Sequence, residues 1–223
     1  PEAHGGLGLG MLELCVIAEE LGRVLAPVPF ASTAYYLAEA VKMAGTDAQK
    51  DDILGRIVAG DVIGAYAVSE GPGEPDPARL TTTFDGQTVS GTKVPVLDGD
   101  VATHAVVLAR EGNGASWVLV DLGGQGVSRK TVKTLEPTRS HAEIVFDQAP
   151  ATRLGRAGEG GDLHDRLMDR VAVLLAFEQL GGASVALEMA TDYAKGRYAF
   201  GRPIGGNQGI KHKLADMYVK NEV

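Results

Sequence analysis

The sequence predicts an α+β chain of several domains, in which helices at both ends flank a central antiparallel β barrel or sandwich. Apolar residues recur at helical spacing in the first sixty residues. From Asp61 to about Phe146 the period is two, with Gly, Asp and Asn at the turns, and helical spacing returns from about Gly161. We therefore expect a partial N-terminal helical domain (1–60), a β-barrel domain (61–150) and the start of a C-terminal helical bundle (151–223).

The N-terminal segment reads as three helices. The first has apolar residues at helical spacing, and Pro27 ends it. A second helix is expected over 31–44. Thr46 and Gln49 have the spacing of a capping box that starts a third helix, and Gly60 is placed to end it. The apolar residues that recur at helical spacing in the first helix are Leu14, Ile17, Leu21 and Leu25.

The central segment reads as short strands joined by tight turns. Asp85-Gly86 between residues 81–84 and 88–92 is a strong hairpin signal, because both turn residues tolerate the backbone that a two-residue hairpin needs. Evenly spaced strands of this kind favour a small barrel or sandwich. The other expected strands are 62–69, 105–109, 117–121, 126–133 and 142–146.

The C-terminal segment reads as one long helix from about Gly161 to Tyr198, followed by a second helix from near Gln208. A run of small residues, Gly181-Gly182-Ala183-Ser184, lies inside the long helix. Small side chains leave room for a second backbone, so we expect another helix to approach there. A Gly-Arg-Pro sequence at 201–203 separates the two helices.

Composition excludes several classes of protein. The chain of 223 residues has a formal net charge of −8, which argues against a general nucleic-acid binder. No run approaches the roughly 20 apolar residues of a membrane span, and the first residues do not resemble a signal peptide, so we expect a cytoplasmic protein. The single cysteine, Cys15, excludes an internal disulfide, and the histidines lack metal-ligand spacing, so no metal site is expected.

The segment Arg197-x-x-Phe200-Gly-x-Pro-Ile, with Gln208 and then Leu-Ala-Asp-Met at 214–217, resembles the acyl-CoA dehydrogenase family. The opening Pro-Glu-x-x-Gly-Gly-x-Gly agrees, and the resemblance covers essentially the whole chain, which looks like the central part of a family member. The resemblance implies a β barrel between helical domains and an FAD cofactor shared across a subunit interface. It assigns Arg197, Phe200 and Gln208 to the FAD of a neighbouring subunit.

The resemblance also assigns residues of the chain's own pocket. Tyr66, Val68 and Ser69 match flavin-contacting positions, and Asp169 matches an aspartate that faces the CoA arm. Other ligand positions depart from the family pattern. The departures are Glu74 and Pro75 for a Gly-Ser pair, Pro95 for a tryptophan, Leu97 for a hydroxyl residue and Ala172 for an arginine.

The implied reaction is α,β-desaturation of an acyl-CoA thioester, with electrons passed to an electron-transferring flavoprotein. The family's catalytic glutamate falls beyond Val223, so no catalytic residue is assigned. The departures favour a subunit with a degenerate flavin pocket that works in a hetero-oligomer, as in bacterial enzymes for steroid or side-chain CoA esters. Two alternatives stay open: a fully active homo-oligomeric dehydrogenase, and a flavin-free structural or binding homologue.

Overall fold

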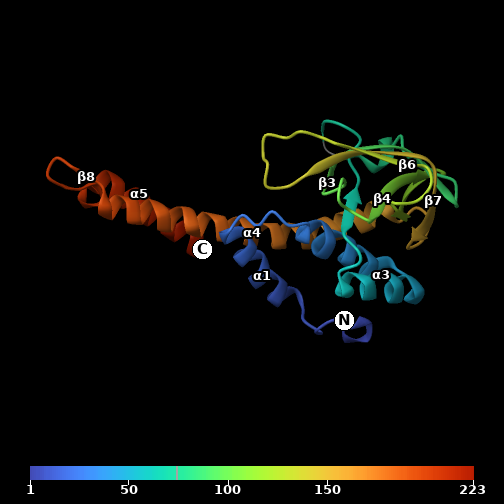
Figure 1. Ribbon diagram of the computed structural model, residues 1–223, viewed down its shortest axis with the longest axis horizontal. Coiled ribbons are helices and arrows are strands. Elements are labelled where there is room, and N and C mark those ends of the chain that lie inside the picture. The colour runs from blue at the N-terminus through green and yellow to red at the C-terminus, as the bar shows by residue number, and fades with distance from the viewer. Residues whose placement is uncertain (74) are drawn as a thin grey trace. The chain divides into compact units, whose positions relative to one another are not determined.

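The computed structural model describes residues 1–73 and 75–223, which form two compact units (Figure 1). Unit 1 comprises Pro1–Gly8 and Pro27–Val171, and unit 2 comprises Leu9–Ala26 and Ala172–Val223. The predicted order of helices, strands and helices is confirmed. The three domain boundaries drawn from the sequence stay predictions.

Unit 1 is built around a closed barrel (Figure 1). Hydrogen-bonded neighbours run β4-β2-β3-β7-β5 and return from β5 to β4, while β1 pairs with β4 and β6 pairs with β7. Most pairs are antiparallel, as predicted, but β1 and β2 each lie parallel to β4. The strands are β1 (Gly64–Ala67), β2 (Thr83–Phe84), β3 (Thr88–Leu97), β4 (His104–Glu111), β5 (Gly114–Asp121), β6 (Val127–Thr131) and β7 (His141–Leu154).

The barrel core follows from the two-residue period. Alternate side chains of β7, such as Ile144 and Phe146, are buried inside it together with Val89 and Val96 of β3. The predicted hairpin between β2 and β3 is confirmed, since the Asp85 carboxylate accepts hydrogen bonds from backbone N–H groups of the turn, at 2.9 Å from Gln87 N and 2.6 Å from Thr88 N. A satisfied turn fixes the register in which the apolar face points inward.

Unit 1 also contains helices. They are η1 (Glu2–His4), the π-helical η2 (Ala31–Ala38), α2 (Glu39–Ala44), α3 (Asp47–Ala59), η3 (Pro77–Arg79) and the start of α4 (Gly160–Gly196). The Thr46 capping box is confirmed, since Thr46 N donates to Gln49 Oε1 at 3.0 Å and Gln49 N donates to Thr46 Oγ1 at 3.3 Å.

The contact between η2 and β1 positions the site described below. The backbone N–H of Gly64 donates to Thr33 Oγ1 at 2.9 Å, which ties the first residue of β1 to η2. A Cβ atom at Gly64 would lie 2.5 Å from Leu37 Cβ, so only glycine allows this approach. The close contact brings the side chains of η2 next to those of β1.

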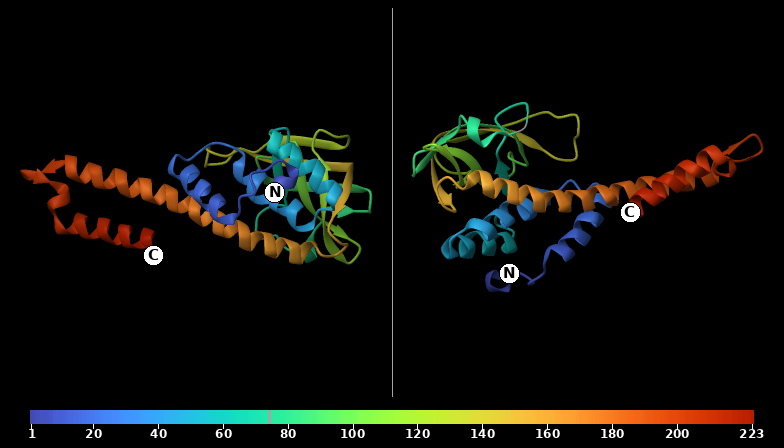
Figure 2. Two further views of the ribbon diagram at one scale, coloured as in Figure 1. Left: turned by 90° about the horizontal axis from the view of Figure 1, so that it is seen from below. Right: turned by 180° about the vertical axis from the view of Figure 1, so that it is seen from behind.

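Unit 2 contains α1 (Met11–Arg23), the later part of α4, a hairpin of β8 (Tyr198–Ala199) and β9 (Arg202–Pro203), η4 (Ile204–Gly206) and α5 (Gln208–Glu222). After the hairpin, α5 runs back in the direction opposite to α4 (Figure 2).

The crossing of α1 and α4 is close enough to require glycine on both helices. A Cβ atom at Gly22 would lie 1.8 Å from Glu178 O, and one at Gly181 would lie 2.0 Å from Glu19 O. The expected close approach at the small-residue run of α4 is therefore confirmed. Small side chains at the crossing allow the two backbones to touch.

Small residues occupy the buried side of α1. Cys15, Ala18 and Gly22 are buried, whereas Ile17 is 41% exposed and Leu25 is 65% exposed. The glycine crossing selects the side of the helix that carries the smallest residues. Leucine or isoleucine at the contact would hold the two helices apart.

One helix, α4, contains an 18-residue window of mean hydropathy 1.4, long and apolar enough to cross a membrane by length and composition alone. The expectation that no run of the chain approaches the length of a membrane span was therefore too strict. Core helices of soluble proteins pass the same test, so this is weak evidence, and α4 carries the close contact with α1.

Candidate functional site

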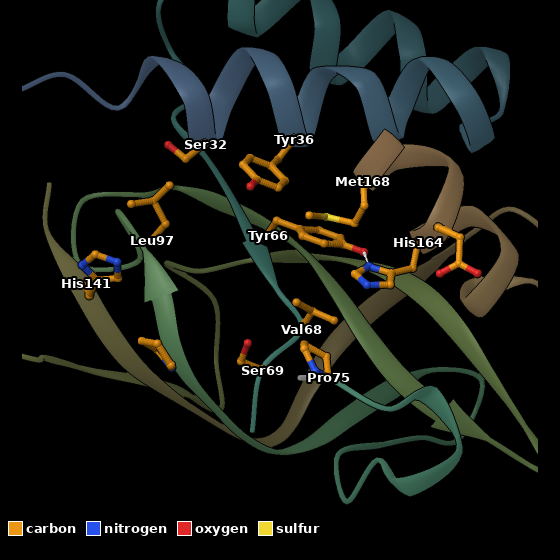
Figure 3. A pocket seen from close by; sticks show the side chains of 12 residues that line it. Ser32, Tyr36, Tyr66, Val68, Ser69, Pro75, Leu97, His141, His164 and Met168 are labelled. Atoms are coloured by element: carbon orange, nitrogen blue, oxygen red, sulfur yellow. Dashed lines mark hydrogen bonds between the residues drawn. The ribbon is translucent and has the colours of Figure 1, made fainter. Parts of the chain in front are cut away.

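A cavity of about 480 Å³ lies in unit 1 beside β1 (Figure 3). Side chains from η2, β1, β3, β7 and α4 and from the segments after β1 surround it. Its described lining includes no lysine or arginine, so it suits a neutral, largely apolar group with a few hydrogen-bonding atoms. The lining residues are Ser32, Tyr36, Tyr66, Val68, Ser69, Pro75, Pro95, Leu97, His141, His164, Asp165 and Met168.

Tyr66 is the best-fixed side chain of the cavity. Its hydroxyl lies 2.7 Å from His164 Nδ1 and accepts a hydrogen bond from Trp117 Nε1 at 3.1 Å (Figure 3). Its ring stacks on that of Tyr36, with a centroid distance of 5.5 Å and an interplanar angle of 18°, and the imidazole of His164 lies at its hydroxyl end, with a centroid distance of 5.9 Å and an interplanar angle of 16° (Figure 3). Burial raises the pKa of Tyr66 far above its ordinary value, so the phenol stays neutral.

Val68 and Ser69 follow β1 and line the same cavity, as Tyr66 does. The Ser69 hydroxyl makes no hydrogen bond with any described residue, although Ser69 is only partly exposed. The Val68 carbonyl accepts a hydrogen bond from Lys93 Nζ at 3.1 Å, which fixes the backbone at this point. The structure therefore brings these three predicted residues together, and one of them has a hydroxyl that bonds to no other residue in the described part of the chain.

Lys93 of β3 is fully buried, although lysine is a residue that is almost never fully buried unless it is paired. Its Nζ lies 2.8 Å from Glu70 Oε1. The Glu70 carboxylate also accepts hydrogen bonds from Thr81 N at 2.7 Å and from Thr82 N at 2.9 Å. This network holds the chain after Ser69 against β3, so Lys93 fixes the wall of the cavity and does not line it.

The charges of this pair follow from burial and hydrogen bonding. Burial acts to raise the pKa of Glu70, but the hydrogen bonds from Lys93, Thr81 and Thr82 outweigh it and hold the pKa well below its usual range. Burial lowers the pKa of Lys93, and the Glu70 carboxylate opposes that shift. Glu70 is therefore an anion, and its role is structural.

A second polar group lies where Ser32 and His141 reach the cavity. Ser32 Oγ donates to the buried Asp98 Oδ2 at 2.7 Å. Burial raises the pKa of Asp98, while the Ser32 hydrogen bond and the nearby Arg139 and His141 act against the shift. Within the described chain, His141 Nδ1 is buried without a hydrogen-bond partner.

Three departures from the family pattern line the cavity directly. Pro95 and Leu97 of β3 present apolar carbon atoms where the resemblance expects an indole and a hydroxyl. Pro75 also lines the cavity, while the predicted departure at Glu74 falls outside the described residues. The Ser69 hydroxyl and the cavity size fit the edge of a flavin ring, but β3 supplies neither of the two side-chain contacts.

Asp169 lies on α4 and is exposed, and it does not line the cavity. The α4 residues that do so are His164, Asp165 and Met168. No site role was predicted for His164 from the sequence. Helical spacing could have placed His164 on the same face as Met168, which follows it by one turn. Nothing in the sequence indicated that Tyr66 would be its partner.

Arg197, Phe200 and Gln208 belong to unit 2, whereas Tyr66, Val68, Ser69 and Asp169 belong to unit 1. Arg197 immediately precedes β8, and Phe200 lies at the tip of the β8–β9 hairpin with φ 54° and 102% exposure. Gln208 is the first residue of α5 and is exposed. The hairpin thus presents a guanidinium and an aromatic ring on one short exposed segment.

Unit 2 also has a cavity of about 400 Å³ between the end of α4 and α5. Lys195 and Lys211 lie in its lining with apolar carbon from Ala194, Pro203 and Leu214. Two ammonium groups beside an apolar surface suit a ligand with both a ring and an anionic group. Among residues 1–73 and 75–223, no three His, Cys, Asp or Glu side chains gather as a metal site would need.

Two family models match the ends of the chain. The model of the acyl-CoA dehydrogenase N-terminal domain matches residues 1–61, and that of the acyl-CoA dehydrogenase C-terminal domain matches residues 158–223. The chain belongs to the acyl-CoA dehydrogenase family. The resemblance found in the sequence is thereby confirmed, and members of this family use FAD.

Individual acyl-CoA dehydrogenases are similar over the whole chain. An acyl-CoA dehydrogenase of Bacillus subtilis is 31% identical over 100% of this chain and 63% of its own length. Acyl-CoA dehydrogenase IpdE2 of Mycobacterium tuberculosis is 32% identical over 98% of this chain and 55% of its own. The solved structure of a Tcur3481–Tcur3483 steroid ACAD variant is 36% identical with a TM-score of 0.88, over 100% of this chain and 60% of that one. The chain therefore spans about three fifths of the length of such relatives.

Proposed function

We propose that this chain is part of an FAD-dependent acyl-CoA dehydrogenase that introduces an α,β double bond into an acyl-CoA thioester. The observation that carries the proposal is the cavity beside β1, where Tyr66, Val68 and Ser69 meet in a chain that belongs to this family. The cavity is mostly apolar and closed on several sides, as a site for a flat ring system should be.

The residues of the chain would bind and orient the flavin. The Ser69 hydroxyl, which makes no hydrogen bond with any other described residue, can donate to or accept from a ring edge, and the Lys93 contact to Val68 keeps that segment in place. When bound, the flavin supplies the acceptor for the hydride that leaves the β carbon. No base is assigned in this chain, because none of the described residues matches the family's glutamate.

We further propose that the flavin is shared with a sister subunit in a hetero-oligomer. The exposed Arg197, Phe200 and Gln208 can reach a cofactor outside their own unit, and an arginine is well suited to bind a pyrophosphate. Pro95 and Leu97 support the same proposal. They remove two contacts to the flavin ring from the chain's own cavity, whereas Arg197, Phe200 and Gln208 are retained.

The proposal also includes a substrate class and an electron acceptor. A relative with a steroid ACAD structure and 36% identity supports a bulky, steroid-type acyl group. The cavity lining, without lysine or arginine among its described residues, is compatible with such an apolar group. An electron-transferring flavoprotein is the proposed acceptor, in a cytoplasmic enzyme.

A fully active homo-oligomer is the second candidate, and the unused Ser69 hydroxyl favours it because that hydroxyl is one feature of a working ring site. A flavin-free structural or binding homologue is the third. It is favoured by the apolar replacements Pro95 and Leu97. Flavin absorbance separates the three.

The test is to purify the chain alone and after co-expression with a sister subunit, and to measure bound flavin. We expect a colourless chain and a yellow complex. Replacing Arg197 and Gln208 together by alanine should lower FAD affinity of the complex by more than about tenfold, since each loses a polar contact, one of them charge-assisted. Lys213→Ala is the matched control, because it removes one positive charge from exposed α5.

The outcomes separate the candidates. A yellow homo-oligomer that oxidises acyl-CoA would favour the second candidate, and no colour with any partner would favour the third. Full FAD affinity in a complex carrying both replacements would refute the sharing of the cofactor through unit 2.

A further inference from the structure

A buried carboxylate joins α2 to α4 within unit 1. Glu39 is the first residue of α2 and is 3% exposed. Its Oε1 contacts Lys42 Nζ on the same helix, and its Oε2 accepts a hydrogen bond from Arg170 Nε of α4 at 3.1 Å. The side chains of Lys42 and Arg170 are 38% and 46% exposed, so both reach inward from the surface to a carboxylate in the interior.

The two ion pairs of Glu39 differ in what they connect. Lys42 lies three residues further along the same helix, so that contact can form within α2 alone. Arg170 is 131 positions away in the sequence, so its contact requires α2 and α4 to approach each other in one geometry. A planar guanidinium restricts the direction of its hydrogen bond as well as the distance.

Stability alone does not explain a carboxylate at this buried position. Removing a carboxylate from water is costly, and replacing a buried ion pair by apolar residues of similar volume is often neutral or stabilising. A fixed geometry between the two helices is a better explanation, because a charged hydrogen bond is lost when the helices shift, whereas an apolar contact adapts.

The geometry fixed by the pair is that of two cavity walls. Tyr36 of η2 precedes Glu39 by three residues, and Met168 of α4 precedes Arg170 by two. Tyr36 and Met168 both line the cavity, and Figure 3 shows them at the side of η2, away from Ser69. The ion pair therefore lies within about one helical turn of both wall residues.

The chain changes from π-helical to α-helical at Glu39. π-helical turns are rare and occur frequently at functional sites. On one side, Gly64 N donates to Thr33 Oγ1 at 2.9 Å and ties η2 to β1. On the other, Arg170 ties the residue that follows η2 to α4. Held from both sides, η2 keeps Tyr36 at one place in the wall.

We infer that Glu39 and Arg170 are positioning residues, whose ion pair sets the spacing of Tyr36 and Met168 and so selects the acyl group that fits between them. Neither residue of the pair is in the cavity lining, so the effect is indirect. The nature of the bound group rests on the proposed function. The acyl part of the thioester suits this side, because Tyr36 and Met168 offer mostly apolar surface.

The first experiment measures amide hydrogen exchange of residues 31–38 in the full chain. Arg170→Met and the matched control Lys42→Met each remove one cation from Glu39, but only the first removes the link to α4. We expect exchange about tenfold faster in Arg170→Met, the effect of one charge-assisted hydrogen bond, and within about twofold of the wild type in Lys42→Met. Equal exchange in the two variants would overturn the inference.

A double variant separates positioning from stability. Glu39→Leu combined with Arg170→Met leaves no buried charge without a partner, so it should melt at or above the wild-type temperature. Residues 31–38 should still exchange about tenfold faster than in the wild type, because the directional link is absent. Wild-type exchange in this variant would show that any packed pair suffices and would exclude the positioning role.

The second experiment compares two thioesters in the complex with the sister subunit. The ratio of kcat/KM for a steroid side-chain thioester to that for a butanoyl thioester should fall about tenfold in Arg170→Met, since small changes of fit in an apolar pocket alter discrimination by that amount. Lys42→Met should keep the ratio within about twofold. Loss of stability alone slows both thioesters equally, so an unchanged ratio in Arg170→Met would contradict the selection of the acyl group.

The two proposals fail separately. If the wild-type complex oxidises neither thioester, the proposed function fails, and hydrogen exchange still decides whether the pair holds η2. If the complex is active but residues 31–38 exchange equally in Arg170→Met and Lys42→Met, the proposed function stands and the positioning role of the pair is excluded.

Discussion

The buried Lys93–Glu70 pair allows a quantitative test of how the cavity wall is held. In Lys93→Met, a fully buried ammonium is replaced by an apolar chain of similar length, and the Glu70 carboxylate loses its charged partner. Removing one member of a buried pair costs about 3–5 kcal/mol. Glu70 keeps its bonds from Thr81 and Thr82 and is 16% exposed, so we expect a value near the lower end, about 3 kcal/mol.

The assay is urea unfolding at pH 7, followed by circular dichroism, for the wild type, Lys93→Met, Glu70→Gln and the double variant. We expect the double variant to be more stable than Lys93→Met, since no charge is then left without its partner. An exposed control, Lys213→Ala, should change the free energy of unfolding by less than about 0.5 kcal/mol. If Lys93→Met also cost less than about 1 kcal/mol, the argument from an uncompensated buried carboxylate would be refuted.

Three further predictions use other features. Gly181→Val should cost at least about 3 kcal/mol in thermal unfolding, because its Cβ would meet Glu19 O at 2.0 Å; an unchanged melting temperature would contradict the crossing. Thr46→Ala should cost about 1 kcal/mol by urea unfolding through loss of the helix cap, and no loss would mean that water replaces it. Asp98→Asn should become more stable relative to the wild type as pH rises from about 4 to 7. Burial raises the pKa of Asp98 in the folded state, so the stability that protonated Asp98 gives the wild type is lost as pH rises through that pKa, whereas asparagine does not titrate. A stability difference between the two proteins that does not change with pH would exclude the raised pKa.

The sequence predicted the parts of the fold that depend on local chemistry. The Asp85 turn and the Thr46 capping box are satisfied by atoms within a few residues, so their sequence patterns were sufficient. The run at Gly181 predicted a close helix contact for the same reason, since only small residues permit one.

The sequence could not predict features that depend on a distant partner. Burial of Lys93 needs Glu70, which is remote in sequence and reaches it only through the pairing after β1. The link between Tyr66 and His164 joins residues 98 positions apart. No periodicity within either segment contains that information, so the candidate site was predicted only where a family resemblance supplied it.

The glycine crossing of unit 2 has a consequence for the order of folding. The α1 side of the crossing is synthesised first, and its counterpart at Gly181 emerges about 160 residues later. At about 5–20 residues per second, the ribosome needs roughly 8 to 32 seconds to deliver that counterpart. During this interval the nascent α1 has nothing of its own unit to pack on, and its apolar side chains are available to chaperones or to misassembly.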